Sequence, residues 1–421
     1  MHREPLIMVC TCEIAGRVRG KGFPARELPS RMTRGVGWVP TNTMISAFGP
    51  IYETPFGTTG DLILTPDANT EVKVDFGDDS APEHFFLGDI KHLDGTPWEC
   101  CPRFFLSRAL DALHTACGLS LFSAFEHEFV YTGVEEIPGS PYSLDAYRRQ
   151  GIFGEALTAA LRSAGVEPDS FLPEYGARQY EITCAPAAGV RAADHAVIVR
   201  EIARATAARL GQRAIFAPIL DPAAVGNGVH IHFSFRDADG RPCMHDPAGV
   251  FGLSPVARHF VAGVLHHLPA LCAVTAPSAV SYFRLRPNRW APTHATLAER
   301  DRGASLRICP LLTTPGADPA KQFNVEYRPA DAAASPYLAL GAMVWAGVDG
   351  IRREFSLPED DGPALPTSLG EALDALEATA AATEWFGATY LSAYLMHKRG
   401  ELRAMDGLDE AAQCARYALT Y

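Results

Sequence analysis

The chain has 421 residues and a formal net charge of −12, with 49 acidic against 37 basic side chains. This length predicts roughly two or three domains, and an apolar share of 47% with 20% charged residues is typical of a globular protein. The acidic excess argues against sequence-independent nucleic-acid binding, which needs a basic surface, and no apolar run reaches the roughly 18 residues of a membrane span.

The first 95 residues are expected to form short strands joined by turns. Residues 6–12 and 61–64 are short apolar runs, and residues 71–76 alternate between apolar and polar side chains. Turn-forming residues at 94–97 mark the expected domain boundary. We therefore expect a β-rich domain over residues 1–95 and a second domain over residues 96–421.

Helical periodicity dominates the rest of the chain, with short alternating strands between the helices. Apolar residues recur at three- and four-residue spacing in residues 104–117, 192–210, 255–274, 337–351 and 368–382. Long helices interleaved with antiparallel-type strands predict an α+β catalytic domain behind the β-rich one.

Cysteine spacing argues against disulfides and zinc. The chain has 10 cysteines, too dilute for a disulfide scaffold at this length. The local pairs Cys10/Cys12 and Cys100/Cys101 lack the repeated spacing of a zinc site, so buried thiols are expected. The chain also starts without the basic-then-apolar pattern of a signal peptide, and a cytoplasmic location is expected.

Three predicted strands, at residues 121–131, 228–235 and 324–328, each have one apolar face and one face with acids, imidazoles or a guanidinium. Residues i and i+2 of a strand lie on the same face. The polar same-face sets are Glu126 with Glu128, His230 with His232 and Ser234, and Glu326 with Arg328. Such groups are rarely buried unless they are paired or bound to a metal.

Each set has an ordinary explanation when it is taken alone. An isolated E-x-E on a strand is usually a solvated face, and H-x-H equally fits an exposed edge or hydrogen-bonded core histidines. The three sets together, with the polar cluster at residues 174–181, instead indicate one functional site. Several carboxylates with one imidazole form a hard ligand set, which suits Mg²⁺ or Mn²⁺ better than zinc.

A series of ordered motifs runs over nearly the whole chain: Gly60-Asp61, Leu64-x-Pro66-Asp67-x-x-Thr70, Pro102-Arg103, Glu126-x-Glu128, Glu174-Tyr175-Gly176, Gln179-Tyr180-Glu181, Gly226-Asn227-Gly228-Val229-His230-Ile231-His232, Ser281-Tyr282-Phe283-Arg284-Leu285, Arg302, Arg307, Val325-Glu326-Tyr327-Arg328-Pro329 and Ser335-Pro336-Tyr337. In this order the motifs resemble those of the glutamine synthetase family and its γ-glutamyl-amine ligase relatives. The resemblance implies an N-terminal β-grasp domain, a glutamine-synthetase-type catalytic domain, and a ringed homo-oligomer with sites between subunits.

The resemblance also implies a role for each matching residue. Two divalent ions, Mg²⁺ or Mn²⁺, would be held by Glu128, Glu174 and Glu181 and by Glu126, His230 and Glu326. ATP, the co-substrate, would contact His232, Ser234, Arg302, Arg307 and Lys321, and the amino-acid and amine substrates would contact Arg284, Arg328, Gly226 and Trp290. Arg302, Arg284 and Trp290 are the residues expected to act in catalysis.

A tryptophan stands where ammonia-using members of the family have a glutamate. Residues 284–292 align without a gap on the family's substrate flap and place Trp290 at that position. The region near residues 37–50, which corresponds to the family's second ammonium carboxylate, contains no Asp or Glu. Two missing anions favour a larger amine, to which Trp290 offers an apolar wall or a π-face worth up to about 2 kcal/mol for a desolvated cation.

The expected function is an ATP-dependent ligase that joins the γ-carboxyl group of glutamate to a non-ammonia amine through a γ-glutamyl phosphate. Two alternatives stay open: a true glutamine synthetase, in which Glu299 or Asp301 replaces the missing acid, and a non-catalytic member of the family. A protonated alkylamine would need a base, for which His294 is a candidate because it is near the flap, whereas an arylamine arrives neutral. Val225 and Ile219 also differ from the family's pattern, and leave the acyl substrate open.

Overall fold

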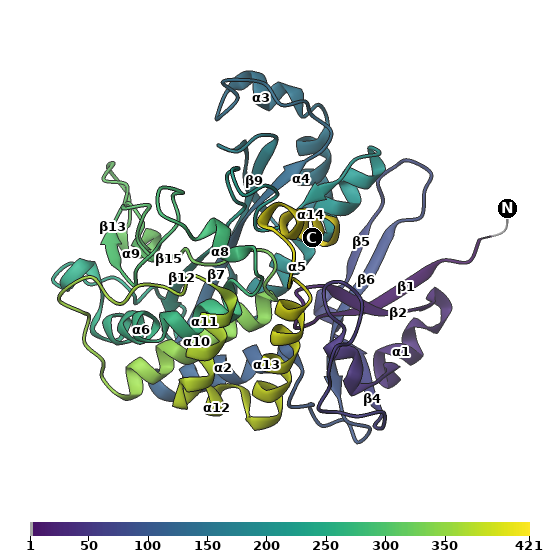
Figure 1. Cartoon of the computed structure of the whole chain (residues 1–421), viewed down its shortest axis with the longest axis horizontal. Helices are drawn as coiled ribbons and strands as arrows, with labels where there is room; N and C mark the ends of the chain where they lie inside the picture. Colours follow the sequence, from purple (N-terminus) through teal and green to yellow (C-terminus); the bar gives the residue numbers. More distant parts are fainter. Residues whose placement is uncertain (1–2) are drawn as a thin grey trace.

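Two β-sheets, one after the other along the chain, organise the computed structural model, which describes residues 3–421 (Figure 1). The first sheet and its accompanying helix comprise β1 (Leu6–Cys12), β2 (Val18–Pro24), α1 (Leu28–Arg34), β3 (Val36–Trp38), β4 (Leu62–Pro66), β5 (Val72–Val74) and β6 (Glu83–Lys91). Its strand order is β2-β1-β6-β4-β3, with β5 also paired to β6. β1 and β6 run parallel, and the other pairs are antiparallel.

The strands predicted at residues 6–12, 61–64 and 71–76 are confirmed by β1, β4 and β5. β6 is an additional strand that the sequence analysis did not predict, although it pairs with three others. Four consecutive residues in its middle are buried, so both faces of this strand are covered. A strand of that kind lacks the alternation by which a half-buried strand is found.

The second sheet contains nine strands among the described residues. They are β7 (Ser120–Tyr131), β8 (Pro168–Pro173), β9 (Gln179–Cys184), β10 (Ala187–Ala188), β11 (Ala214–Ile215), β12 (Val229–Arg236), β13 (Leu297–Glu299), β14 (Leu306–Ile308) and β15 (Val325–Tyr327). The order is β13-β14-β15-β12-β7-β9-β8, with β10 and β11 paired to β7. The three strands that carry the predicted polar sets therefore lie side by side as β15, β12 and β7.

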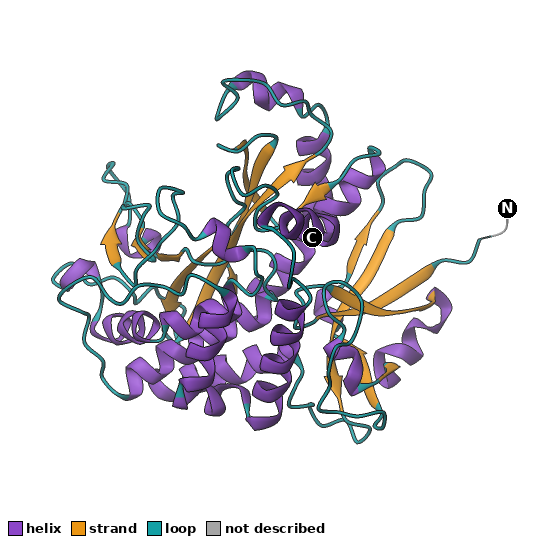
Figure 2. Cartoon of the chain, in the orientation of Figure 1, coloured by secondary structure: helices purple, strands orange, loops and turns teal. Residues whose placement is uncertain are grey.

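Helices gather on one side of this sheet, at the bottom of the view in Figure 2. The helices of this part of the chain are α2 (Pro102–Cys117), α3 (Leu144–Arg149), α4 (Phe153–Ser163), α5 (Val190–Arg209), α6 (Pro255–His266), α7 (Leu268–Thr275), α8 (Ser281–Arg284), α9 (Pro319–Gln322), α10 (Pro336–Arg352), α11 (Leu369–Ala378), α12 (Ala380–Phe386), α13 (Ala388–Arg403) and α14 (Glu410–Thr420). The almost fully buried α10 packs against α2, α5 and α6. At its contact with α6, a Cβ on Gly350 would lie 2.6 Å from the Cα of Gly263, so two glycines permit this close approach. The predicted α+β architecture is confirmed.

Two of the predicted helices are each divided into two. The segment 255–274 forms α6 and α7 with a break at His267, because Pro269 has no amide hydrogen and occupies the first turn of α7. The segment 368–382 forms α11 and the start of α12, separated by Thr379 in an extended conformation. The hydroxyl of Thr379 donates to the Ala375 carbonyl at 2.8 Å, which satisfies one of the free carbonyls at the end of α11.

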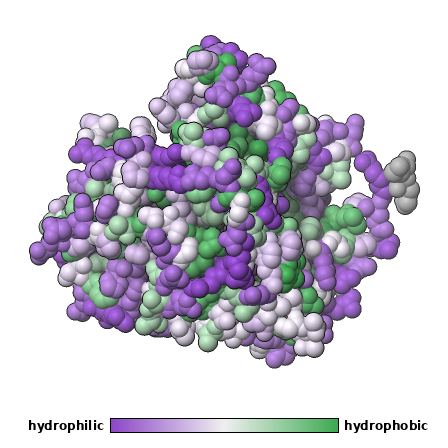
Figure 3. Space-filling view, in the orientation of Figure 1, coloured by the Kyte–Doolittle hydropathy of each residue, from purple (hydrophilic) through white to green (hydrophobic). Residues whose placement is uncertain are grey.

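All 10 cysteines are free, and the two local pairs, Cys10/Cys12 and Cys100/Cys101, are buried. Burial raises the pKa of the Cys10 thiol to about 12, so these groups behave as small apolar side chains. Within residues 3–421 no helix has the length and apolarity needed to cross a membrane. The face drawn in Figure 3 mixes hydrophilic and apolar residues.

Arg103, in the first turn of α2, connects helix α5 to the first sheet through one buried guanidinium. It donates to both carboxylate oxygens of Asp194 on α5, at 2.9 and 3.0 Å. It also donates to Asp89 on β6 at 3.2 Å and to Asp67, which follows β4, at 2.8 Å. Asp194 is 1% exposed and accepts a further hydrogen bond from Tyr337. The pair with Asp194 is therefore desolvated, whereas the side chains of Asp67 and Asp89 are 26% and 33% exposed. The network joins elements far apart in the sequence.

We expect Arg103→Ala to lower the free energy of unfolding by about 3–5 kcal/mol, because it leaves the Asp194 carboxylate buried without its cation. The shift of the urea midpoint at a fixed chain concentration measures this effect. Arg162→Ala is the matched control, since Arg162 and its partner Glu167 are both mostly exposed and such pairs contribute at most about 1 kcal/mol. Equal midpoints for the two variants would contradict a structural role for the Arg103 network.

Candidate active site

The predicted polar sets lie opposite one another in neighbouring strands of the second sheet. The opposed pairs are Glu181 with Glu128, Glu126 with His230, His232 with Glu326, and Glu326 with Arg307. Directly opposed residues of an antiparallel pair place their side chains on the same face of the sheet. The strand register therefore assembles side chains that are up to 200 positions apart in the sequence order into one polar face.

A cavity of about 710 Å³ opens on this face. The predicted site residues that line it are Glu126, Glu128, Glu174, Glu181, Gly226, His230, Arg284, Trp290, Arg302, Arg307 and Arg328. Residues that had no assigned role also line it, among them Tyr142, Leu172, Tyr175, Gln179, Asn288 and Arg289. Every lining residue belongs to the part of the chain after residue 120, so the first sheet contributes nothing to this cavity of the single chain.

The four glutamates of the cavity differ in their surroundings. Burial alone would raise the pKa of Glu126, but contacts with His230 at 3.3 Å and His232 at 3.1 Å lower it well below its usual value. Burial raises the pKa of Glu181 to about 9, and repulsion from the neighbouring carboxylates adds to the shift. Burial, followed by the charge of Glu128, also raises the pKa of Glu174. Such crowding of acids is costly unless a cation joins them.

The donor set therefore fits divalent cations. The atoms of Glu126, Glu181 and His230 that would bind a metal lie within 4.8 Å of one another. Carboxylate oxygens are hard donors of the kind that Mg²⁺ and Mn²⁺ prefer. Bound cations would relieve the repulsion that raises the pKa of Glu181.

Gln179 orients Glu128 within this group. Its side-chain amide donates to Glu128 at 3.2 Å, to the carbonyl of Gly226 at 2.9 Å and to the Asn227 side chain at 2.9 Å. The backbone amide of Gly228 donates to Glu128 at 2.7 Å. Gln179 lies two residues before Glu181 on β9, so the two side chains lie on the same face of the strand. This spacing was the signal in the sequence that pointed to Gln179.

Arg284 is buried beside the cavity and passes across Gly226. Its guanidinium donates to the carbonyl of Ala330 at 2.8 Å. A Cβ on Gly226 would lie only 2.4 Å from Cγ of Arg284, so glycine is required there for the arginine to reach the cavity. Gly226 therefore makes room for the Arg284 side chain, a role separate from the substrate contact expected from the sequence.

Glu326 lies just behind the cavity wall and is completely buried. It accepts hydrogen bonds from Arg328 at 2.5 Å and from Arg307, and His230 lies 3.4 Å away. Burial would raise the pKa of Glu326, but His230 and the two arginines lower it instead. Glu326 is therefore an anion held between two arginines, with the imidazole of His230 beside it.

The flap residue Trp290 stands at the mouth of the cavity and is 65% exposed. Its ring stacks on Tyr175, with centroids 5.9 Å apart and planes 28° apart. Its backbone carbonyl accepts from Arg328 at 3.1 Å. Trp290 and Asn288 both have positive φ, 53° and 63°, a conformation that is strained for a bulky residue and is concentrated at functional sites.

Some predicted residues lie outside the cavity wall. His232 contacts Glu126 behind the cavity wall, and Ser234 lies two residues further along β12. Lys321 is 72% exposed on α9 and pairs with Asp318 at 3.5 Å. The candidate base His294 and the substitute acids Glu299 and Asp301 do not line the cavity.

Tyr142 reaches the cavity from the loop before α3, and its hydroxyl donates to Glu174 at 2.8 Å. Burial, with the hydrogen bond to Glu174, raises the pKa of Tyr142 above its usual value. No periodic pattern surrounds this residue, so it had no local signal in the sequence. Together with Tyr175 and Trp290 it makes the cavity entrance aromatic.

Two family models match consecutive parts of the chain. The glutamine synthetase N-terminal domain matches residues 2–98, and the glutamine synthetase catalytic domain matches residues 99–417. A γ-glutamylpolyamine synthetase from Streptomyces coelicolor is 32% identical over 99% of this chain and 93% of its own length. A glutamine synthetase from Pyrococcus furiosus is 30% identical over 90% of this chain and 86% of its own length.

Solved structures agree with this result. A crystal structure described as a novel glutamine synthase homolog has a TM-score of 0.96 and 43% identity, covering 100% of this chain and 99% of its own. A GmaS–ADP complex has a TM-score of 0.82 and covers 96% of this chain and 95% of its own, but at 24% identity it shows a shared fold alone.

Proposed function

The chain belongs to the glutamine synthetase family, and from that premise we propose that it is an ATP-dependent ligase that joins the γ-carboxyl group of glutamate to an organic amine. The observation that carries the proposal is the aromatic pair of Trp290 and Tyr175 at the mouth of a cavity whose interior holds carboxylates and arginines. A relative over almost the whole chain is a γ-glutamylpolyamine synthetase, which supports an organic amine.

Family members generally use ATP with divalent metals such as Mg²⁺ or Mn²⁺. In this chain Glu128, Glu174 and Glu181 would hold one ion, and a second would be held by Glu126, His230 and Glu326. When bound, these ions supply positive charge to the phosphate oxygens. The acidic cluster, with the raised pKa of Glu181, supports this assignment.

Two of the arginines, with His232, would contact the ATP phosphates, and two others would bind the glutamate. Arg302 and Arg307 would neutralise the phosphoryl group while the γ-carboxylate of glutamate attacks it and ADP leaves. Arg284 and Arg328 would hold the glutamate carboxylates, a task that suits the planar guanidinium. The amine would then attack the acyl carbon of the γ-glutamyl phosphate. Inorganic phosphate would leave with the C–O bond electrons, and the nitrogen would lose one proton to the departing phosphate or to water.

The entrance residues would select the amine. An aromatic face attracts a desolvated cation by about 2 kcal/mol, and Trp290 and Tyr175 supply two such faces. A glutamate at position 290 would instead attract ammonium and accept its proton. Since His294 does not line the cavity, an amine that arrives neutral, such as an arylamine, remains the alternative to a cationic alkylamine or polyamine.

The family's members form oligomers, and we propose that this chain forms a ring in which a neighbouring subunit completes the site. The open position of Trp290 and the absence of any residue before 120 from the cavity lining, among residues 3–421, support this arrangement.

Phosphate release from ATP, with Mg²⁺ and glutamate, tests the function across ammonium, methylamine, ethanolamine, putrescine and aniline, with mass spectrometry of the product. We expect at least one organic amine to exceed ammonium in kcat/KM by about tenfold or more, the effect of roughly 1.4 kcal/mol. Trp290→Glu should reverse this preference, whereas Trp290→Phe, which keeps an aromatic face, should retain it. A preference of the unmodified chain for ammonium would identify a true glutamine synthetase instead.

A further inference from the structure

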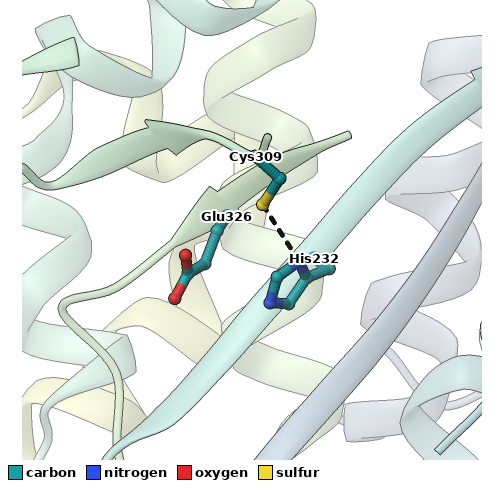
Figure 4. Close-up of side chains that lie close together, drawn as sticks. All are labelled: His232, Cys309 and Glu326. Atoms are coloured by element: carbon teal, nitrogen blue, oxygen red, sulfur yellow. Dashed lines mark hydrogen bonds between the residues drawn. The ribbon is translucent and has the colours of Figure 1, made fainter. Parts of the chain in front are cut away.

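Cys309 follows β14, and its sulfur atom lies close to the side chains of His232 and Glu326 (Figure 4). It is 9% exposed, and its Sγ lies 3.6 Å from Nδ1 of His232 on β12. Glu326 on β15, between these two strands, completes a group in which one donor atom from each residue lies within 4.8 Å of the others. None of the proposed steps of the ligase reaction uses the thiol.

The spacing of this group fits a tetrahedral metal. Zinc bonds to thiolate sulfur at about 2.3 Å and to imidazole nitrogen at about 2.0 Å, which places the two donors about 3.5 Å apart. The observed separation of Sγ and Nδ1, 3.6 Å, matches that value. The Asn324 side-chain oxygen, 2.8 Å from the same Nδ1, is the contact that a metal would displace.

The donor types separate this group from the carboxylates of the cavity. Thiolate and imidazole are soft and borderline donors that select Zn²⁺ or Cd²⁺, whereas Mg²⁺ gains little from sulfur. Arg307 and Arg328 next to Glu326 oppose a dication, and the thiolate, Glu326 and nearby Glu126 supply the negative charge that offsets them. The sulfur therefore decides which metal this group binds.

We propose that Cys309, His232 and Glu326 form a soft-metal site that binds Zn²⁺ or Cd²⁺, with loss of the thiol proton and of the proton that Nδ1 of His232 donates to Asn324, and that its occupation inhibits the enzyme. Inhibition, which rests on the proposed function, follows because the metal takes His232 away from the ATP phosphates and Glu326 away from its arginines and from the second divalent ion. Metal binding itself does not depend on that function.

The metal-free full-length chain should be titrated with Co²⁺ and Cd²⁺, whose bonds to thiolate give a charge-transfer absorption. We expect the band to appear with one equivalent per chain and to be lost in Cys309→Ser. Cys243→Ser is the matched control, because Cys243 is a partly exposed thiol outside this group, and it should keep the band. A band that is absent in the unmodified chain, or lost only in Cys243→Ser, would overturn the proposal.

Zn²⁺ affinity, measured by competition with a chromophoric chelator, should fall at least about tenfold in Cys309→Ser, since even the loss of an outer contact costs about 10–100-fold. Cys309→Ala gives a second test that does not depend on the serine hydroxyl, and far-ultraviolet circular dichroism checks its fold. Both variants should keep turnover with Mg²⁺ and lose sensitivity to Zn²⁺. Unchanged Zn²⁺ affinity in these variants would mean that the metal binds the carboxylates instead, and would overturn the proposal. Failure of the ligase assay alone would contradict the proposed function but not the metal site.

Discussion

Arg302→Ala is expected to lower kcat by at least about 10³-fold, the loss seen when an arginine that neutralises a transferring phosphoryl group is removed. Arg302 lines the cavity and, within the described residues, has no carboxylate partner, whereas Arg307 and Arg328 are both paired with Glu326. Its charge is therefore more available to ATP than the charges of Arg307 and Arg328. Steady-state phosphate release with saturating glutamate and amine measures the loss.

Arg300→Ala provides the matched control for this variant. Arg300 is an exposed arginine two positions away that does not line the cavity, and its loss should change kcat by less than about twofold, as for a surface substitution. The two variants remove the same charge from the same loop, so they separate a local role from a general electrostatic one. A decrease of less than tenfold in Arg302→Ala would assign the phosphoryl group to Arg307 instead.

Most residues of the candidate site could be predicted from the sequence, because strand periodicity is a local pattern. E-x-E, H-x-H and E-x-R each fix which side chains share a face, and the structure shows those faces opposed as Glu126–His230 and His232–Glu326. The register itself depends on pairing between distant segments, which no local pattern determines. The family resemblance supplied that long-range information, and the two matching domains confirm the family itself.

Other features depend on the fold and had no local signal. Tyr142 reaches Glu174 from an irregular loop, and Cys309 meets His232 only because β14 and β15 fold back toward β12. Trp290 likewise combines a positive φ with a carbonyl contact to Arg328, which lies 38 positions further along the chain. The unpredicted strand β6 shows the same limit, since burial on both faces removes the alternation that marks a strand.

Glu181→Gln is expected to have opposite effects on stability and activity. Burial and neighbouring carboxylates raise the pKa of Glu181 to about 9 in the metal-free chain, so ionising this group destabilises the fold. The neutral amide removes that cost and should raise the free energy of unfolding at about pH 8 by at least about 1.4 kcal/mol, the equivalent of one pKa unit. Loss of a metal-binding carboxylate should at the same time lower kcat by about 100-fold or more.

The pH dependence distinguishes this explanation from a simple packing effect. The folded-state pKa lies above the ordinary 4.5, so the stability that protonated Glu181 contributes is present below about pH 4.5 and is lost as the pH rises toward about 9. The stability difference between Glu181→Gln and the unmodified chain should therefore grow over that range in chelator-treated protein, and Mg²⁺ should reduce it by stabilising only the carboxylate. Urea titrations at several pH values, with and without Mg²⁺, measure both changes. A difference that does not vary with pH would mean that another group already neutralises Glu181, and the crowded carboxylates would then need no cation.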